Sequence, residues 1–276
     1  MGLCLQAATS PKRWSKPSPI QRLRLLTVCQ YQWLVRYGVA ADHQGTKAMI
    51  RQYARLFEKQ CVVSAGNLSV GSTSTLDLSE TALQEMFDVV VLATGLSQDQ
   101  RLSLAGESLP QVYGPGSMTR NWNDHPEEQE WAPAFGQKVV VVGNSNVAID
   151  VVRFLAKRTY DFEASDLYLS IVVNGISEIN IVGRSSVHLA KFDPVMIREL
   201  GKINGLKIRL YALLSQLTQN KRLLALCETS AVANRKAPTT VLTFYFSWQP
   251  MALERCKIIL SGLVLQSGAG VKNPSL

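Results

Sequence analysis

The chain has 276 residues, 46% of them hydrophobic and 18% charged, and its formal net charge is +8. This composition suits one or two soluble globular domains, and no apolar run approaches the roughly 20 residues of a bilayer-spanning helix. The positive charge favours an acidic or phosphorylated partner without identifying it.

The cysteines and histidines argue against the commoner metal sites. The five cysteines are odd in number and widely spaced, with no C-x-x-C pair and no zinc-type cluster with histidine. We therefore expect a reducing compartment, no structural metal and no iron-sulfur cluster. The histidines are isolated in the sequence and are expected to be solvent-facing or singly hydrogen-bonded. They are His43, His125 and His188.

The N-terminal segment is basic and free of acidic residues. The first 41 residues contain six Lys or Arg side chains and no Asp or Glu. Such a leader suits a mitochondrial transit peptide, and the alternative that we prefer is a divergent or disordered segment over residues 1–33 of a cytoplasmic protein. A secretory signal is excluded because no apolar h-region is present.

Strand and helix signals follow this segment. Apolar residues at helical spacing predict an amphipathic helix over residues 45–60, and a strand is expected within residues 61–71. Asp77 and Glu80 have capping-box spacing ahead of a short helix. An apolar run then predicts a buried strand that ends at Thr94 and Gly95.

The connector is rich in turn residues. Residues 96–137 have weak periodicity and many Gly, Pro and Asn, so we predict loops there. The pair Gly114 and Gly116 and the pair Gly268 and Gly270 are interpreted as turns, because the sequence around them shows no preceding strand and following helix.

A second unit begins at Lys138. Alternating strand and helix patterns predict a parallel α/β sheet. The expected strands are 138–142, 178–182, 206–211, 239–248 and 256–266, and the expected helices are 146–157, 166–174, 194–202 and 219–230.

The sequence VVVVGNSNVAID predicts a strand, a glycine turn and a helix. Gly143 suits the tight turn, Asn146 the helix cap, and Ala148 close packing of the helix on the strand. The free N–H groups of the helix N-terminus would then face a pyrophosphate. Because many strand-to-helix turns need a small residue for backbone reasons alone, a purely structural turn is the alternative.

Ser145 occupies the place of the middle glycine in this turn. We expect its backbone to adopt a strained positive φ, which costs about 1 kcal/mol. On that basis Ser145→Gly is predicted to tighten nucleotide binding several-fold.

The following strand ends where such folds contact the adenosine ribose. Arg184 and Ser185 stand there instead of an acidic residue, and a guanidinium with a hydroxyl suits the 2'-phosphate of NADP. Arg184 follows Gly143 by about twice the usual ~20 residues, so we expect residues 158–170 to loop out. The alternative is a solvated arginine at a strand end.

In residues 34–248 these features resemble the ferredoxin/adrenodoxin-type NADP reductases, flavoenzymes with the glutathione-reductase-like fold. The resemblance rests on ordered blocks, among them LVRYGVAADHQGTK, DVVVLATG, NWNDHP, VVGNSNVAIDVVRFL and EINIVGRS. It implies hydride transfer from NADPH to FAD and then single-electron transfer to an iron-sulfur protein, without an obligatory acid or base. It also implies doubly wound parallel sheets, with a Rossmann-like NADPH domain next to a partial FAD domain.

The resemblance assigns roles by position. It implies that the NADPH pyrophosphate is held by Gly143, Asn144, Ser145, Asn146 and Val147, and the 2'-phosphate by Arg184 and Ser185. It places Glu199 near the nicotinamide half, and it implies FAD contacts for Leu34, Val70, Thr94 and Gly95. Lys221 and Arg222 match a segment that docks the acidic ferredoxin, and a solvated helix face is the alternative for them.

The sequence also departs from this family. Residues 1–33 contain Gly2 as their only glycine, so they lack the G-x-G-x-x-G turn that holds the FAD pyrophosphate. A second flavin-contacting segment is not found, and the usual arginine pair is reduced to Arg184 and Ser185. We therefore expect a partial FAD domain over residues 34–130 and an NADP domain over residues 136–276.

Two functions follow as hypotheses. One is a truncated or degenerate NADPH-ferredoxin reductase, and the other is a non-catalytic NADP-binding fragment that no longer holds FAD. A nucleic-acid binder is disfavoured because no helix-turn-helix, zinc-finger or aromatic-platform pattern is found.

Overall fold

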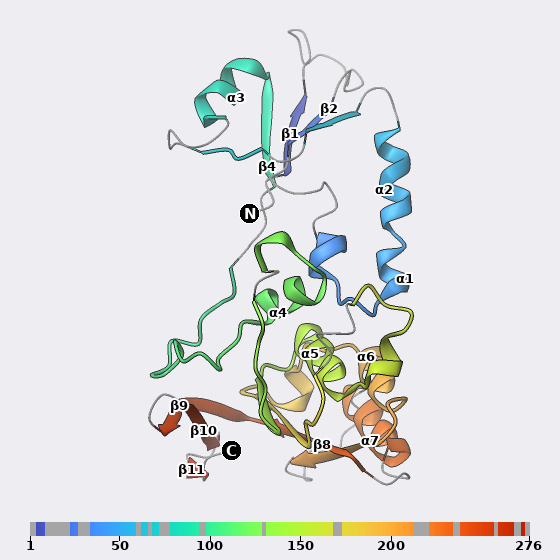
Figure 1. Ribbon diagram of the computed structural model, residues 1–276, viewed down its shortest axis with the longest axis vertical. Coiled ribbons are helices and arrows are strands. Elements are labelled where there is room, and N and C mark those ends of the chain that lie inside the picture. The colour runs from blue at the N-terminus through green and yellow to red at the C-terminus, as the bar shows by residue number, and fades with distance from the viewer. Residues whose placement is uncertain are drawn as a thin grey trace. The chain divides into compact units, whose positions relative to one another are not determined.

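The computed structural model separates into two compact units, Met1–Gln98 and Asp99–Leu276 (Figure 1). The residues that it describes are 4–8, 23–26, 34–58, 62–65, 68–71, 78–93, 98–128, 131–167, 173–211, 221–233, 238–256, 259–267 and 272–273.

The first unit contains a four-stranded mixed sheet of order β3-β2-β1-β4. Its strands are β1 (Cys4–Ala8), β2 (Leu23–Leu26), β3 (Val62–Ala65) and β4 (Val89–Ala93). β1 is antiparallel to β2 and to β4, and β2 is parallel to β3. Part of the segment expected to be divergent or disordered is therefore in strands, because its backbone pairs with the distant β4, which local composition does not reveal.

Short helices accompany this sheet: the π-helix η1 (Leu34–Gly38) and the α-helices α1 (Gln44–Lys47), α2 (Ile50–Phe57) and α3 (Glu80–Met86). The single helix expected over residues 45–60 is divided into α1 and α2. The predicted α3 is confirmed, but its N-cap is Ser79, whose hydroxyl accepts from Ala82 N at 3.1 Å. Asp77, the expected cap, lies outside the described residues.

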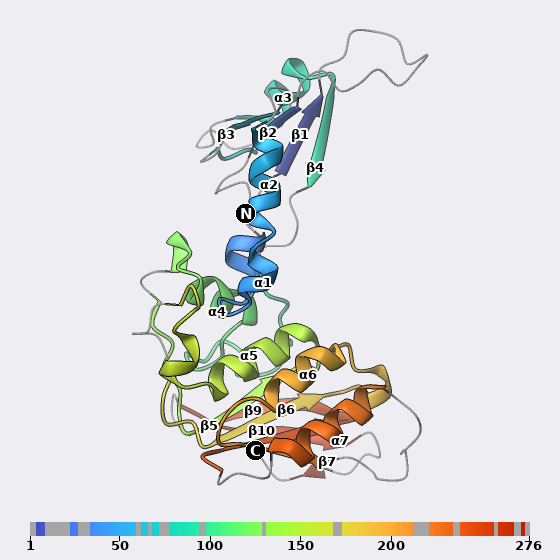
Figure 2. The same ribbon diagram turned by 90° about the vertical axis from the view of Figure 1, so that its right-hand side faces the viewer.

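The second unit contains a parallel sheet of order β5-β6-β8-β7, and four of the five expected strands lie in it. All three pairings between neighbouring strands are parallel. Figure 2 shows α5, α6 and α7 lying along this sheet. The bounds are β5 (Lys138–Val142), α5 (Asn146–Ala156), β6 (Glu178–Gly183), α6 (Pro194–Leu200), β7 (Leu206–Tyr211), α7 (Lys221–Ala233) and β8 (Thr240–Phe246).

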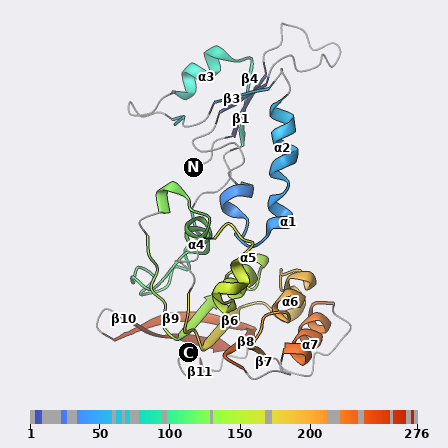
Figure 3. The ribbon, with the colours of Figure 1, turned by 45° about the vertical axis from the view of Figure 1, so that its right-hand side comes forward.

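A second, antiparallel sheet completes this unit (Figure 3). It consists of β9 (Trp248–Cys256), β10 (Ile259–Ser267) and β11 (Lys272–Asn273). Val182 of β6 packs against Leu263 and Leu265 of β10, and all three side chains are buried. The face of the parallel sheet that carries Val182 is thus covered by strands.

The connector contains a helix that the sequence did not predict. α4 (Pro115–Trp122) has Gly114 as its N-cap and is followed by the 3-10 turn η2 (Pro126–Glu128). The interpretation of Gly114 and Gly116 as a turn without a following helix is therefore wrong. Trp122 stacks on Phe154 of α5 with ring centroids 3.5 Å apart, and both rings are buried. This stack fixes α4 in the core of the second unit.

The inserted segment between α5 and β6 also differs from expectation. It forms the 3-10 helix η3 (Thr159–Phe162), and the described part of residues 166–174 contains no helix. Phe162 is 1% exposed and packs on Phe154. The buried side chain of Phe162 therefore anchors this insertion, which does not form the expected helix in its described part.

Candidate functional site

The turn between β5 and α5 depends on glycine for its backbone conformation. Gly143 has φ +131°, in the region that L side chains rarely adopt, and its N–H donates to Val182 O at 2.8 Å. The turn is therefore bonded to the end of the neighbouring strand β6. The predicted glycine turn between a strand and a helix is therefore present.

Ser145 does not have the expected strained backbone. Its φ is −102° and its ψ is 176°, an extended conformation, and it is the N-cap of α5 with no side-chain cap hydrogen bond. The chain has already reversed at Gly143, so no positive φ is needed two residues later. The expected strain at Ser145 and the expected capping role of Asn146 are both wrong.

Asn146 instead ties two helix starts together. It is the first residue of α5, and its Oδ1 accepts from Asp193 N at 2.7 Å. Asp193 is the N-cap of α6, with its carboxylate accepting from Val195 N at 2.7 Å. The N-termini of α5 and α6 consequently lie side by side, while Val147 in the first turn of α5 is 47% exposed.

Asn144 projects its side chain against the end of β6. A Cβ atom on Gly183 would lie 2.7 Å from Asn144 Cγ, so glycine is needed there for space. Asn144 Nδ2 is buried and has no hydrogen-bond partner among the described residues. An unpaired buried donor typically costs about 1–3 kcal/mol, so this amide is suited to a ligand that brings an acceptor.

The predicted 2'-phosphate residues lie at the same edge of the sheet as the glycine turn. β5 and β6 are parallel with Val142 opposite Val182, so their carboxyl ends coincide. Arg184 is exposed, and no described carboxylate forms an ion pair with it. The backbone of Ser185 is fixed by a hydrogen bond, because its carbonyl accepts from Ser247 N at 3.1 Å.

Glu199 belongs to a charged cluster between α5 and α6 that was not predicted from the sequence. Arg153 Nη1 donates to Glu199 Oε2 at 3.1 Å, and Arg153 Nη2 lies 2.7 Å from Asp150 Oδ1. The Arg153 side chain is 3% exposed, whereas that of Glu199 is 32% exposed. An Asp and an Arg three residues apart within the apolar stretch of α5 were the available signal.

The residues expected near FAD lie in the first unit or outside the described chain. Leu34 is 67% exposed at the start of η1. Val70 is half-buried and packs with the cluster around Leu83. Thr94 and Gly95 lie outside the described residues.

The two basic residues expected to dock a ferredoxin have different environments. Lys221, the first residue of α7, is exposed. Arg222 is half-buried, and its Nε donates to Phe192 O at 3.0 Å. Arg222 therefore braces α7 against the segment that precedes α6.

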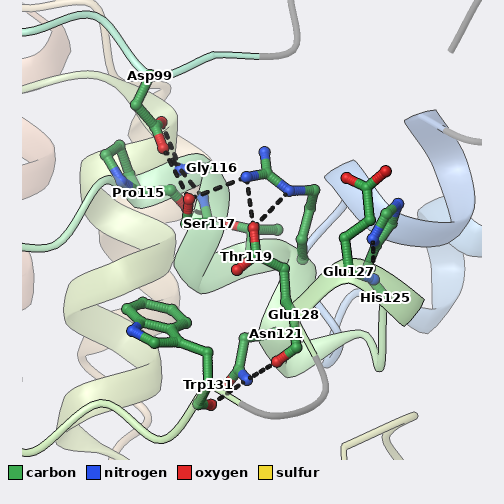
Figure 4. Close-up of polar contacts among 11 residues, drawn as sticks. Asp99, Pro115, Gly116, Ser117, Thr119, Asn121, His125, Glu127, Glu128 and Trp131 are labelled. Carbon is green, nitrogen blue, oxygen red and sulfur yellow. Dashed lines mark hydrogen bonds and ion pairs between the residues drawn. The ribbon is translucent and has the colours of Figure 1, made fainter. Parts of the chain in front are cut away.

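A polar cluster around α4 was not predicted (Figure 4). Asp99 accepts from Gly116 N at 2.7 Å and from Ser117 N at 3.1 Å, so its carboxylate occupies the N-terminus of α4. A Cβ on Gly114 would lie 2.5 Å from Asp99 Cγ. The two glycines thus make room for a carboxylate of the chain itself.

The rest of this cluster holds the segment after α4 in place. Arg120 pairs with Glu128 at 2.6 Å, and Asn121 Nδ2 donates to the carbonyls of Glu128 and Trp131. His125 is 1% exposed, and its Nδ1 accepts from Glu127 N at 3.1 Å. Burial is the main cause that lowers the pKa of His125 below its ordinary value of 6.5. His125 is consequently neutral at pH 7, and its hydrogen bond with Glu127 N stabilises the segment after α4.

Sequence and structure comparisons identify similar proteins. No protein-family model matches the chain. It is 41% identical over 256 residues to the cindoxin reductase of Citrobacter braakii, which covers 91% of this chain and 54% of that protein. It is 32% identical over 183 residues to the mitochondrial NADPH:adrenodoxin oxidoreductase of Arabidopsis thaliana, covering 64% of this chain and 37% of that protein.

Solved structures of Mycobacterium tuberculosis FprA have a similar fold. One matches with a TM-score of 0.82 and 26% identity, over 95% of this chain and 61% of that one. Another, described as in complex with NADPH, matches with a TM-score of 0.81 and 25% identity. The chain spans about half the length of the cindoxin reductase and about three fifths of FprA. No helix among the described residues is long and apolar enough to cross a membrane.

Proposed function

Because the chain belongs to the ferredoxin/adrenodoxin-type NADP reductase family, we propose that its second unit binds NADPH and serves an FAD-dependent NADPH-ferredoxin oxidoreductase. One observation carries the proposal: the glycine turn at Gly143 and the exposed Arg184 lie at the ends of two adjacent parallel strands. Such folds bind dinucleotides at the carboxyl edge of the sheet.

The pyrophosphate is proposed to lie over residues 143–147. Gly143 lets the backbone approach the ligand, and the N–H groups of the first turn of α5 lack intrahelical partners, as at every helix start. Asn144 Nδ2 would donate to a phosphate oxygen and so gain the partner that it lacks. The Ser145 hydroxyl makes no cap hydrogen bond and is a second donor.

The adenosine 2'-phosphate is proposed to pair with Arg184 and Ser185. A guanidinium forms charge-assisted hydrogen bonds with phosphate, so the site would prefer NADPH to NADH. No acidic residue stands at this strand end to accept from the ribose of NADH.

Glu199 is proposed to lie beside the nicotinamide half. Its carboxylate is held by Arg153, which Asp150 pairs from the same helix α5. These contacts orient the carboxylate before any ligand binds, which lowers the entropy lost on binding.

FAD supplies the hydride acceptor and releases electrons singly when it is bound. In the first unit, Leu34 exposes a large apolar side chain at a π-helix and is suited to contact a flavin ring. FAD contacts of Thr94 and Gly95 are also part of the proposal. Val70 already packs on the Leu83 cluster and is a weaker candidate.

The electron acceptor is proposed to be an acidic iron-sulfur protein of the ferredoxin or adrenodoxin kind. The net charge of +8 favours an acidic partner, and Lys221 is exposed at the start of α7. Arg222 contributes mainly by holding α7 in place, because its guanidinium is bonded to Phe192 O.

A second candidate function is an NADP-binding protein without flavin. Residues 1–33 contain Gly2 as their only glycine, so they do not supply a G-x-G-x-x-G turn for the FAD pyrophosphate.

Calorimetric titration of the full chain with NADPH, NADH and FAD tests both candidates. NADPH binding together with a bound, NADPH-reducible flavin supports the reductase, and NADPH binding without flavin selects the second candidate. A chain that binds neither NADPH nor FAD would show that both are wrong.

A further inference from the structure

The segment after η5 (Val187–Leu189) is fastened to the proposed pyrophosphate turn. Lys191 N donates to Asn144 O at 3.0 Å, and Lys191 forms an isolated parallel bridge with Ser145. Two residues later, Asp193 N donates to Asn146 Oδ1 at 2.7 Å. These contacts fix the backbone of Lys191 beside the start of α5.

The Lys191 side chain leaves the backbone beside this turn and carries a positive charge. The residue is exposed, and no described carboxylate forms an ion pair with its ammonium group. The nearest carboxylate in sequence, that of Asp193, accepts from Val195 N as the cap of α6. The first turn of α5 contains no acidic residue. The charge is thus available to a bound anion.

An independent observation indicates that an acceptor belongs in the same turn. Asn144 Nδ2 is a buried donor without a partner, and the backbone carbonyl of this residue is the one that Lys191 contacts. A phosphate oxygen would satisfy this amide. α5 has 11 residues, so its N-terminal N–H groups add to the same positive potential.

We propose that Lys191 is an additional ligand of the NADPH pyrophosphate, an assignment that rests on the proposed NADPH site. The backbone of Lys191 is hydrogen-bonded to the turn at Asn144. The candidate ligands of the 2'-phosphate instead follow the end of β6, where the Ser185 carbonyl accepts from Ser247 N. The pyrophosphate is common to NADPH and NADH, so Lys191 supports the binding of both. Arg184, in contrast, supports the binding of NADPH alone.

Titration with NADPH and with NADH distinguishes the role of Lys191 from that of Arg184. Full-length chains with Lys191→Ala, Arg184→Ala and Lys202→Ala are titrated with NADPH and with NADH at one salt concentration. Lys202 is the matched control, because it is an exposed lysine after the opposite end of α6. Lys191→Arg keeps the charge and tests rescue.

Lys191→Ala is expected to weaken the binding of both nucleotides by the same factor, about fivefold for one partly exposed charge contact. Arg184→Ala is expected to weaken only NADPH binding, Lys202→Ala neither, and Lys191→Arg to restore most of the affinity. Affinities of Lys191→Ala that equal those of the unaltered chain, or that fall for NADPH alone, would overturn the assignment and leave the NADPH site standing. Failure of the unaltered chain to bind NADPH would overturn the site and the assignment together.

Discussion

Arg153 on α5 donates to Glu199 on α6 across 3.1 Å, and its guanidinium is almost completely buried. A buried charge is tolerated only when it is paired and hydrogen-bonded. Arg153 satisfies this condition by contacting Asp150 on its own helix as well as Glu199 on the neighbouring one. The pair therefore links the packing of two helices to a residue of the proposed nicotinamide site.

This pair predicts unequal costs for the two partners. Arg153→Met should lower the free energy of unfolding by about 3 kcal/mol, because two carboxylates lose their common partner. Glu199→Gln should cost only about 1 kcal/mol, since Asp150 still pairs with the guanidinium. Urea unfolding of both variants and of the double variant tests this. Additive losses in that cycle would show that the two side chains are not coupled.

Gly183 should tolerate no side chain. Gly183→Ala places a Cβ against the Asn144 amide, and we expect a loss of about 1–3 kcal/mol in stability together with weaker NADPH binding. Gly136→Ala is the control, because the nearest atom to its Cβ would be 3.9 Å away. Equal thermal midpoints for the two variants would contradict the close contact.

Ser145→Gly should not tighten NADPH binding. The extended backbone of Ser145 leaves no strain for glycine to relieve, and glycine removes a hydroxyl that is free to donate. An affinity equal to or lower than that of the unaltered chain is expected in a calorimetric titration. Several-fold tighter binding would show that the turn changes conformation around the ligand.

Asp99 should stabilise α4 through its charge and its two acceptor oxygens. Asp99→Ala removes the partners of Gly116 N and Ser117 N, at a cost of about 1–2 kcal/mol, whereas Asp99→Asn retains one acceptor and should cost less. Thermal unfolding of both variants measures the difference. An alanine variant as stable as the unaltered chain would exclude a capping role.

His125 predicts a loss of stability in weak acid. Burial keeps its folded pKa below 6.5, so between the folded and unfolded pKa values the unfolded chain binds more protons and the free energy of unfolding falls as pH decreases. His125→Asn, with an oxygen that can accept from Glu127 N, should flatten this dependence. Chemical unfolding between pH 5 and pH 7.5 tests this prediction. The range avoids the titration of Glu178, because the Asn180 hydrogen bond is the main cause that lowers the pKa of Glu178 below its ordinary value of 4.5. An unchanged slope in the variant would assign the effect to another group.

The features that the sequence predicted well are local. The alternation of apolar strands and amphipathic helices after Lys138 predicted the parallel sheet because hydrophobic periodicity follows directly from strand and helix geometry. The helix α4 was missed because its start depends on Asp99, whose carboxylate binds Gly116 N from 17 residues away. The strands β1 and β2 were missed because they form by pairing with distant segments.

The sequence by itself determined where the glycine turn and Arg184 occur, because residue type and spacing carry that information. Only the tertiary structure decided how they are used. The pairing of β5 with β6 brings both to one edge, the reversal at Gly143 relieves Ser145 of strain, and the hydrogen bond from Lys191 N to Asn144 O places a further cation beside the turn. Each of these depends on contacts between residues far apart in the chain, which no local pattern specifies.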